Sequence, residues 1–292
     1  MPRPILKKRM SVLKEHKTLL LENRRNPEFK QKLEFDNPNY ALCSKSLFIG
    51  KVYFKENGKT KPKTVVIKEL DLDRSTYRVA TGNAPTVIQE IKDYIIIKKL
   101  KATPKTITEF YNKTIIELRK AGIPLPKMMA VTRDEKVLII SQYFGNKRLR
   151  KLTKNNLELF LLGPDKEKLI ELYARIINKG FIPTLDLIEI MKTKEGKLEP
   201  IPIDIDQQVM YYLKYGKINK IKNNGMQILI AKDISRSFFR NLCLMLHENK
   251  AKEIRGIMKS ILTKINIDYL KENLIPMMKK DILLRDYLQK EK

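Results

Sequence analysis

The pattern of apolar residues changes character about halfway along the chain, and this change restricts the fold more than any other feature. Apolar residues of the first part cluster in β-branched runs, whereas those of the second part recur every three or four positions, as in helices. A β-rich part followed by a helical part predicts an α+β protein with two lobes. The predicted strands are 46–54, 63–72 and a strand–turn–strand segment at 128–145. The predicted helices are 9–24, 86–100, 106–122, 166–180 and most of the chain after about residue 226.

The same pattern predicts how the chain divides. Residues 1–40 hold a basic amphipathic helix and a loop, residues 41–145 form the β-rich lobe, and residues 146–292 form the helical lobe with one hairpin. The basic N-terminal helix can pack on the body of the protein or lie on a membrane surface. Packing on the β-rich lobe is the simpler expectation.

The net charge narrows the class of partner. The 292 residues carry a formal charge of +27, which favours an anionic partner such as a nucleotide, a phosphorylated substrate, a membrane surface or a nucleic acid. The lysines are scattered along the whole chain, so part of this charge is a solvated surface. The sequence has no tryptophan to stack on bases and no RNA-recognition, KH or zinc-finger motif, which makes nucleic acid the less favoured partner.

Cysteine and histidine exclude several kinds of site. Two isolated cysteines, Cys43 and Cys243, predict neither a disulfide framework nor a zinc site. His16 and His247 lie near opposite ends of the chain, which argues against a Ser-His-Asp triad. Catalysis would have to use carboxylates, lysines, hydroxyls and a bound cation. No apolar run reaches the roughly 20 residues that span a bilayer, and the basic start is a poor secretory signal, so the cytoplasm is expected.

One hairpin carries two acidic residues at its open end. The runs 188–192 and 197–206 flank a short turn, and antiparallel pairing about that turn sets Asp186 opposite Asp204. If the second strand continues to residue 206, Asp204 and Asp206 share one face. Carboxylates brought together favour a cation between them, as phosphoryl transfer with Mg²⁺ requires. The plain alternative is a half-buried strand with a wet face.

The order of these elements resembles the protein-kinase-like superfamily over about residues 44–210. TVVIK resembles the V-A-I-K strand motif, EKVLIISQYFG resembles the fifth strand and hinge, and NKGFIPTLDLIEIM resembles the catalytic loop. PIPIDID resembles the strand that leads to the metal-binding aspartate of D-F-G. A degenerate phosphate loop and an altered catalytic loop are similar to those of bacterial lipopolysaccharide-core sugar kinases and secreted effector kinases. The resemblance implies a two-lobed kinase-like fold whose residues 41–145 bind nucleotide.

The resemblance also implies catalytic roles for four residues. Lys68 would contact the α- and β-phosphates of ATP, and Asp186 would accept the proton of the acceptor hydroxyl. Asp204 would hold Mg²⁺ or Mn²⁺, and Asp206 would assist it. The expected reaction is transfer of the γ-phosphoryl group to an alcohol.

The remaining matches concern the nucleotide. Gly50 would be the single glycine of the phosphate loop. A glutamate would pair with Lys68, and Glu109 is preferred to Glu90 because the IPLPKMMAV that follows its helix resembles the passage into the fourth strand. The hinge residues whose backbone would meet the adenine are Gln142, Tyr143 and Phe144.

The sequence also departs from the kinase pattern. Thr184 and Leu185 replace the His and Arg of the catalytic loop, Met191 stands where Asn holds a second cation, and Ile205 follows Asp204 in place of Phe. A single-metal enzyme and a nucleotide-binding pseudokinase both fit these changes.

Three functions follow as expectations. The first is an atypical ATP-dependent kinase acting on a sugar, a glycolipid or a protein; its basic surface suits an anionic acceptor or a membrane surface, and a secreted effector is compatible with the resemblance. The second is a pseudokinase that binds nucleotide without turnover. The third is a basic nucleic-acid-binding protein, which predicts affinity that falls steeply with salt. The sequence specifies neither the acceptor nor the oligomeric state.

Overall fold

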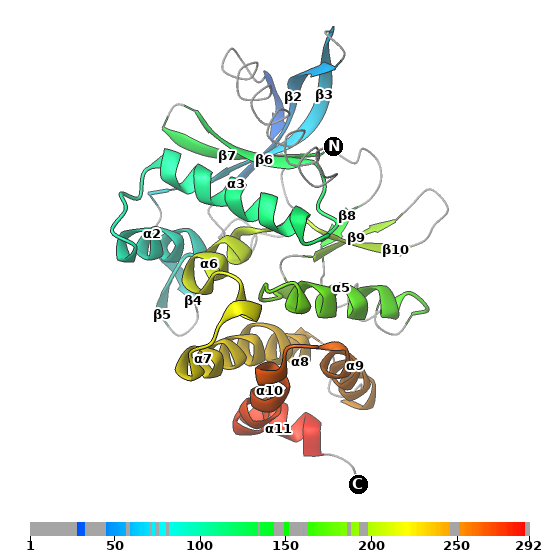
Figure 1. Cartoon of the computed structure of the whole chain (residues 1–292). Helices are drawn as coiled ribbons and strands as arrows, with labels where there is room; N and C mark the ends of the chain where they lie inside the picture. The colour runs from blue at the N-terminus through cyan, green and yellow to red at the C-terminus, as the bar shows by residue number, and fades with distance from the viewer. Residues whose placement is uncertain are drawn as a thin grey trace, which may run out of the picture. The chain divides into compact units, whose positions relative to one another are not determined.

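The structure is a computed structural model of the chain, and it combines helices with antiparallel strands (Figure 1). By contact, the chain forms two compact units: unit 1 comprises Met1–Leu118 and Pro126–Tyr143, and unit 2 comprises Arg119–Leu125 and Phe144–Lys292. The residues that the structure describes are 28–32, 45–56, 59–70, 72–73, 76–79, 82–133, 135–142, 149–151, 160, 163–185, 188–192, 198–245 and 251–289. The predicted helix at 9–24 lies outside them.

Unit 1 is built on a five-stranded antiparallel sheet in the order β1-β2-β3-β7-β6. Its strands are β1 (Glu28–Lys32), β2 (Lys45–Glu56), β3 (Lys59–Leu70), β6 (Met128–Arg133) and β7 (Lys136–Gln142). A separate two-stranded hairpin pairs β4 (Thr76–Val79) with β5 (Gly82–Pro85). The strands predicted at 46–54 and 128–145 are confirmed where the structure describes them, and the strand predicted at 63–72 ends at Leu70, because Leu72 lies in a bend.

The two faces of this sheet differ. One face holds an apolar cluster whose six side chains come from β3, β6 and β7: Val65, Ile67, Met129, Val131, Leu138 and Ile140. The opposite face carries Lys68, whose cross-strand neighbour Ile139 in turn pairs with Ala130. Successive side chains of a strand point to opposite faces, so the β-branched run of β3 places Lys68 opposite the apolar cluster.

Two helices complete the described part of unit 1. They are α2 (Val87–Ile97) and α3 (Pro104–Lys120), as the sequence predicts. The Thr86 hydroxyl caps α2 by accepting the Gln89 N–H at 3.1 Å. α3 lies along the sheet (Figure 1), where the Thr108 and Thr132 hydroxyls bond at 2.8 Å. Thr132 shares a face with Ala130 and Lys68, so α3 contacts the edge strand β6 on the side of the sheet that carries Lys68.

A buried asparagine fastens α3 to the edge strand β6. The Nδ2 of Asn112 donates to the Ala130 carbonyl and its Oδ1 accepts the Ala130 N–H, both at 2.8 Å. Both backbone groups of Ala130 therefore bond to one side chain. Ala130 is consequently a non-hydrogen-bonded position of the β6–β7 ladder, with its polar groups directed away from β7.

Unit 2 contains a three-stranded antiparallel sheet in the order β10-β9-β8, with β8 (Leu149–Lys151), β9 (Ile188–Lys192) and β10 (Leu198–Pro202). Leu198 pairs with Lys192, and Pro202 pairs with Ile188. This is the register that the sequence predicts from the position of the turn. Both prolines of β10 lie on the outermost strand of this sheet, where a missing N–H is tolerated.

The predicted continuation of this strand to residue 206 is wrong. β10 ends at Pro202, and Asp206 begins a helix, α6 (Asp206–Tyr215), which the sequence analysis did not predict. The residues of α6 that are buried include Asp206, Val209, Met210 and Leu213, which recur at helical spacing. Packing of this stripe outweighs the strand-like alternation of the preceding residues.

Helices form the rest of unit 2. They are α5 (Lys166–Asn178), a 3-10 turn at Ile218–Lys220, α7 (Asn224–Ile234), a π-helical segment at Ser235–Arg240, α8 (Asn241–Met245), α9 (Ala251–Lys264), α10 (Asp268–Lys280) and α11 (Ile282–Gln289). α10 contacts α7 and α11, and α9 contacts α5. Helices predicted at 166–180 and after residue 226 are thus confirmed where they are described. Within that part of the chain, no helix combines the length and apolar character needed to cross a membrane.

The largely aliphatic core of unit 2 contains an aromatic cluster. The rings of Tyr173 and Phe238 lie 4.4 Å apart, and Phe238 in turn meets Phe239 edge-on at 5.0 Å. Burial, with a smaller effect from the charge of Asp281, raises the pKa of the nearby Cys243 thiol to about 12. The thiol therefore stays protonated at neutral pH and packs as an apolar group.

Candidate functional site

Lys68 occupies a half-buried position in the middle of unit 1. It lies on β3 between Leu47 of β2 and Ile139 of β7, on the side of the sheet where α3 contacts β6. A lysine held between two strands presents its charge from a fixed backbone position, as a phosphate-binding residue must. Its role as a phosphate ligand remains a prediction.

α3 does not direct Glu109 toward Lys68. The side chains that α3 buries against unit 1 include Ile107, Thr108 and Tyr111, whereas Glu109 is exposed, like Lys105 one turn earlier. The structure therefore does not bring together the predicted pair. The sequence after the helix favours Glu109, but that sequence does not specify which face of α3 carries this residue. The alternative residue, Glu90, is half-buried in the first turn of α2.

The other residues assigned to the nucleotide lie in regular structure or outside the described chain. Gly50 is inside β2, paired with Phe29 and Val65, so the described structure gives it a ladder position within a strand. Gln142 ends β7, and its N–H donates to the Lys127 carbonyl at 2.7 Å, so this N–H is not free to bind an adenine. Tyr143 and Phe144 lie outside the described residues.

Asp204 stands at the junction of β10 and α6. It is half-buried, two residues beyond the end of β10, and its Oδ1 accepts the Asp206 N–H at 3.4 Å. Asp206 is 3% exposed and is the first residue of α6. A carboxylate in the first helical turn interacts favourably with the helix dipole, which gives Asp206 a structural role whether or not it assists a metal.

Asp186 lies outside the described residues. The segment before it is held by a hydrogen bond from Gln208. Gln208 of α6 is buried, and its Nε2 donates to the Ile182 carbonyl at 2.7 Å and approaches the Thr184 hydroxyl at 3.5 Å. Gln208 thus ties the helix that follows Asp204 to the segment that leads to Asp186. The sequence analysis missed this residue, although its position one turn after Asp204 on a helical stripe was the available signal.

The residues at the junction of β10 and α6 fit a metal site with few protein ligands. Mg²⁺ is commonly held by one or two carboxylates together with substrate phosphates and water. Among the described residues, no group of three or more His, Cys, Asp or Glu side chains gathers as ligands. Asp204 is a half-buried carboxylate, so it offers oxygen ligands of the type that Mg²⁺ prefers. When bound, the metal would neutralise phosphate charge.

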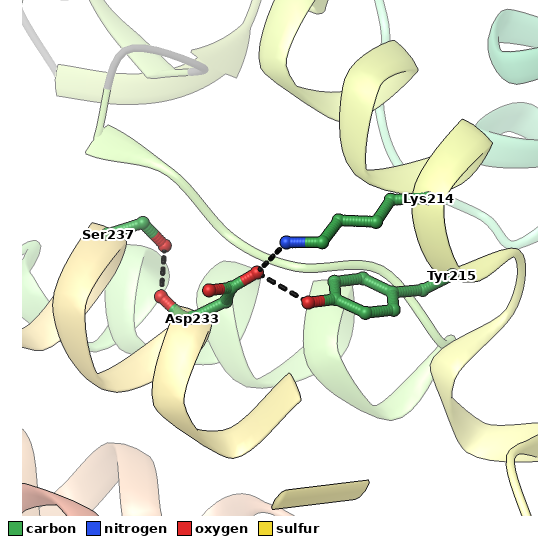
Figure 2. A network of polar contacts seen from close by, with 4 residues as sticks. All are labelled: Lys214, Tyr215, Asp233 and Ser237. Atoms are coloured by element: carbon green, nitrogen blue, oxygen red, sulfur yellow. Dashed lines mark hydrogen bonds and ion pairs between the residues drawn. The ribbon is translucent and has the colours of Figure 1, made fainter. Parts of the chain in front are cut away.

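A second polar cluster joins α6 to α7 (Figure 2). One oxygen of Asp233, Oδ2, accepts the Tyr215 hydroxyl at 2.6 Å and the Lys214 ammonium at 2.8 Å. The Lys214 ammonium also lies 4.8 Å from the centre of the Tyr215 ring. The Ser237 hydroxyl donates to the Asp233 carbonyl at 2.6 Å. These contacts hold α6, and therefore the Asp204 junction, against the helical core.

The cluster changes the pKa of two of its members. Burial, and then the bond to Asp233, raise the pKa of Tyr215 above its ordinary value. Burial by itself would lower the pKa of Lys214, but the hydrogen bonds and charges of Asp233 and Tyr215 outweigh that effect and raise it. Both groups therefore stabilise the folded state below about pH 10, and this contribution is lost as the pH rises further.

We expect Tyr215→Phe to lower the free energy of unfolding by about 1–2 kcal/mol at pH 8, because the carboxylate of Asp233 loses a buried donor. The difference in the free energy of unfolding between the variant and the wild-type protein should shrink above about pH 10. At that pH the phenol of Tyr215 ionises in the unfolded wild-type chain and so stabilises the unfolded state. Urea unfolding at pH 8 and pH 10.5 measures both effects. Tyr269→Phe is the matched control, because the Tyr269 hydroxyl donates at 2.9 Å to the neutral carbonyl of Ile218. An equal loss in both variants at pH 8 would contradict the special role of Asp233.

Comparison of the chain with protein-family models and with curated proteins finds no match. Any function assigned to the chain therefore depends on the residues and geometry described above.

Proposed function

We propose that the protein is an atypical ATP-dependent phosphotransferase with a two-lobed, protein-kinase-like fold. Its acceptor is a hydroxyl group of an anionic sugar, a glycolipid or a protein. The observation that carries the proposal is the register of the β9–β10 hairpin, which delivers Asp204 to the start of α6 as the sequence pattern of a metal-binding aspartate requires.

Unit 1 supports the proposal independently. A half-buried lysine lies on the third strand in sequence of a five-stranded antiparallel sheet, on the side where the long helix that precedes β6 contacts that edge strand. This is the element order in which a kinase presents its phosphate-contacting lysine. The division of the chain at Tyr143 and Phe144 agrees with a hinge after β7.

The proposed reaction is in-line transfer of the γ-phosphoryl group. In such a reaction the protein mainly positions the reactants and neutralises charge. Lys68 steadies the α- and β-phosphates, and Asp204 holds the Mg²⁺ or Mn²⁺ that neutralises phosphate charge. Asp186 accepts the proton of the acceptor hydroxyl, whose oxygen forms a bond to the γ-phosphorus. The bond from that phosphorus to the bridging oxygen breaks, and ADP leaves. The excess of lysine and arginine over acidic residues favours an anionic acceptor.

Thermal unfolding with ATP tests the nucleotide site directly. ATP with Mg²⁺ or Mn²⁺ at 100 times its dissociation constant should stabilise the protein by about 2.7 kcal/mol, and chelation of the metal should remove most of that gain. Asp204→Ala and the isosteric Asp204→Asn should both lose the metal-dependent part. Asp268→Ala is the control, because Asp268 is an exposed aspartate on α10 and its loss should leave the nucleotide effect unchanged.

The outcomes separate three functions. A metal-dependent gain that is lost in both Asp204 variants supports the nucleotide site, and transfer that is lost in Asp186→Ala then identifies a kinase. The same gain without any turnover identifies a pseudokinase. No stabilisation by any nucleotide would refute the proposal, and salt-dependent nucleic-acid binding would become the next function to test.

A further inference from the structure

The C-terminal end of α2 forms a tight reversal of the chain. Lys99 has a positive φ of 60°, and its N–H donates to the Ile96 carbonyl at 2.7 Å. The Leu100 N–H donates to the Ile95 carbonyl at 3.1 Å. This pair of hydrogen bonds is a Schellman motif, which brings the residues after a helix back beside its last turn. Ile96, Ile97 and Leu100 are therefore neighbours at one corner.

These three apolar side chains face solvent although α2 has a separate buried face. Ile88, Ile91 and Ile95 fix the helix to unit 1 and are almost fully buried. In contrast, Ile96 is 58% exposed, Ile97 is 70% exposed and Leu100 is 47% exposed. Since the buried stripe already anchors the helix, the three exposed residues contribute little to folding. A cluster of large exposed apolar side chains is typical of an interaction surface.

The charged residues from Lys98 to Lys105 are all basic. Lys98, Lys99, Lys101 and Lys105 are exposed, and no acidic residue occurs between Asp93 and Glu109. Within the described chain, none of these four lysines forms an ion pair with a neighbouring acid. We call these four lysines, together with Ile96, Ile97 and Leu100, the α2 corner.

We propose that the α2 corner docks the protein on the surface of a bilayer that contains anionic phospholipid. The three apolar side chains enter the boundary between headgroups and acyl chains, and the lysines contact the lipid phosphates. Interfacial segments of peripheral proteins combine these same two features, apolar insertion and basic attraction to anionic lipid. The proposal does not rest on the nucleotide site, because binding to the bilayer needs no nucleotide.

Charge favours the bilayer over other occupants. A symmetric contact between two copies of the chain would place one set of lysines against the other, and like charges brought together oppose association. A nucleic acid would pair with the lysines but would leave three aliphatic side chains without apolar contact. Nucleic-acid surfaces stack bases on aromatic rings, and residues 95–105 contain none. Of these three occupants, only a membrane interface offers apolar contact to the three aliphatic side chains and an anionic partner to the lysines.

The test is sedimentation of the full chain with vesicles of phosphatidylcholine alone or with 30% phosphatidylglycerol. Two variants divide the corner: a triple serine variant of Ile96, Ile97 and Leu100, and a quadruple glutamine variant of Lys98, Lys99, Lys101 and Lys105. A charge-matched control replaces four exposed lysines of unit 2 by glutamine: Lys252, Lys259, Lys279 and Lys280. Because all substituted side chains are exposed, thermal unfolding should show that every variant is folded.

We expect the wild-type protein to bind the anionic vesicles and not the neutral ones. The glutamine variant of the corner should bind about a hundredfold more weakly, and the triple serine variant about tenfold more weakly, even at equal net charge to wild type. The unit 2 control should change the affinity by less than about threefold.

Three results would overturn the proposal. Equal losses in the two glutamine variants would mean diffuse attraction by the whole basic protein. Unchanged binding of the triple serine variant would mean that no apolar group enters the bilayer. A dimer in sedimentation velocity that the triple serine substitution abolishes would assign the corner to a second copy of the chain.

Discussion

Replacing Asn112 by alanine should lower the free energy of unfolding by about 2–4 kcal/mol. The side chain bonds to both backbone groups of Ala130 at 2.8 Å, and the hydrogen bonds are buried. Alanine would leave a buried N–H and a buried carbonyl without partners, and each such group costs about 1–3 kcal/mol. The contact also fastens α3 to the edge of the sheet that carries Lys68, so the variant should also weaken the nucleotide-dependent stabilisation that the proposed function predicts.

Urea unfolding followed by circular dichroism measures this loss, since the chain has no tryptophan to report by fluorescence. Thr108→Val is the matched control on the same helix. Its hydroxyl makes one hydrogen bond, to the exposed Thr132, so its removal should cost about 1 kcal/mol or less. If Asn112→Ala is no more destabilising than Thr108→Val, the two backbone bonds are not what holds α3 in place.

Gly180→Ala should lower the free energy of unfolding by about 1–3 kcal/mol, for a different reason. Gly180 has a φ of +89°, and an added Cβ would lie 2.5 Å from the Oδ1 of Asn219 and 3.2 Å from the Cδ of Lys217. A side chain at positive φ costs about 1–2 kcal/mol, and the overlap adds about 1 kcal/mol, because the atoms that the Cβ meets belong to side chains of Asn219 and Lys217 that can shift. The same glycine accepts the Ile218 N–H through its carbonyl at 3.0 Å, so the backbone cannot easily move away.

Two further variants separate strain from overlap. Gly122→Ala also places a side chain at positive φ, here +77°, but nothing lies within 4 Å of the added Cβ. It should therefore cost only the conformational part, about 1–2 kcal/mol. Gly180→Ala combined with Asn219→Ala should recover part of the stability of Gly180→Ala. Thermal unfolding of the four proteins decides the matter, and equal losses in the two single glycine variants would show that the overlap is relieved without cost.

Gly180 also links stability to the proposed chemistry. It ends the helix before the segment 181–185, where Phe181 stacks on Tyr212 and receives the Lys217 ammonium 3.7 Å from its ring centre. Gln208 bonds to the next residue, Ile182. The stretch that leads to Asp186 is therefore held by ring, cation and amide contacts, although the His and Arg of the kinase catalytic loop are replaced.

Local rules predicted the strands and the hairpin because their signals are short in range. β-branched runs locate β2, β3, β6 and β7, and the polar turn fixes the register of β9 and β10. The rule failed at Asp206, where the alternating pattern before Pro202 was extended too far. Helical spacing from Asp206 to Leu213 was present in the sequence, and packing in unit 2 decided in its favour.

The candidate site was less predictable than the fold. Lys68 and Asp204 are proposed from motif order alone, whereas the position of Glu109 depends on the rotation of α3, which buries Thr108 and Asn112 and leaves Glu109 exposed. The bond from Gln208 to Ile182 joins residues 26 positions apart. Contacts of this kind depend on tertiary packing, and the spacing of residues along the sequence reveals little about that packing.

The bond between Asn112 and Ala130 has a consequence for self-association. β6 is an outer strand of the five-stranded sheet, and such strands offer backbone groups on which another chain can add a strand and begin to aggregate. At Ala130 the outward N–H and carbonyl are already bonded to a side-chain amide, which copies the donor and acceptor of a neighbouring strand. An incoming chain would have to displace Asn112 before it could pair there, so the same residue that anchors the helix also protects the sheet from growth along this edge.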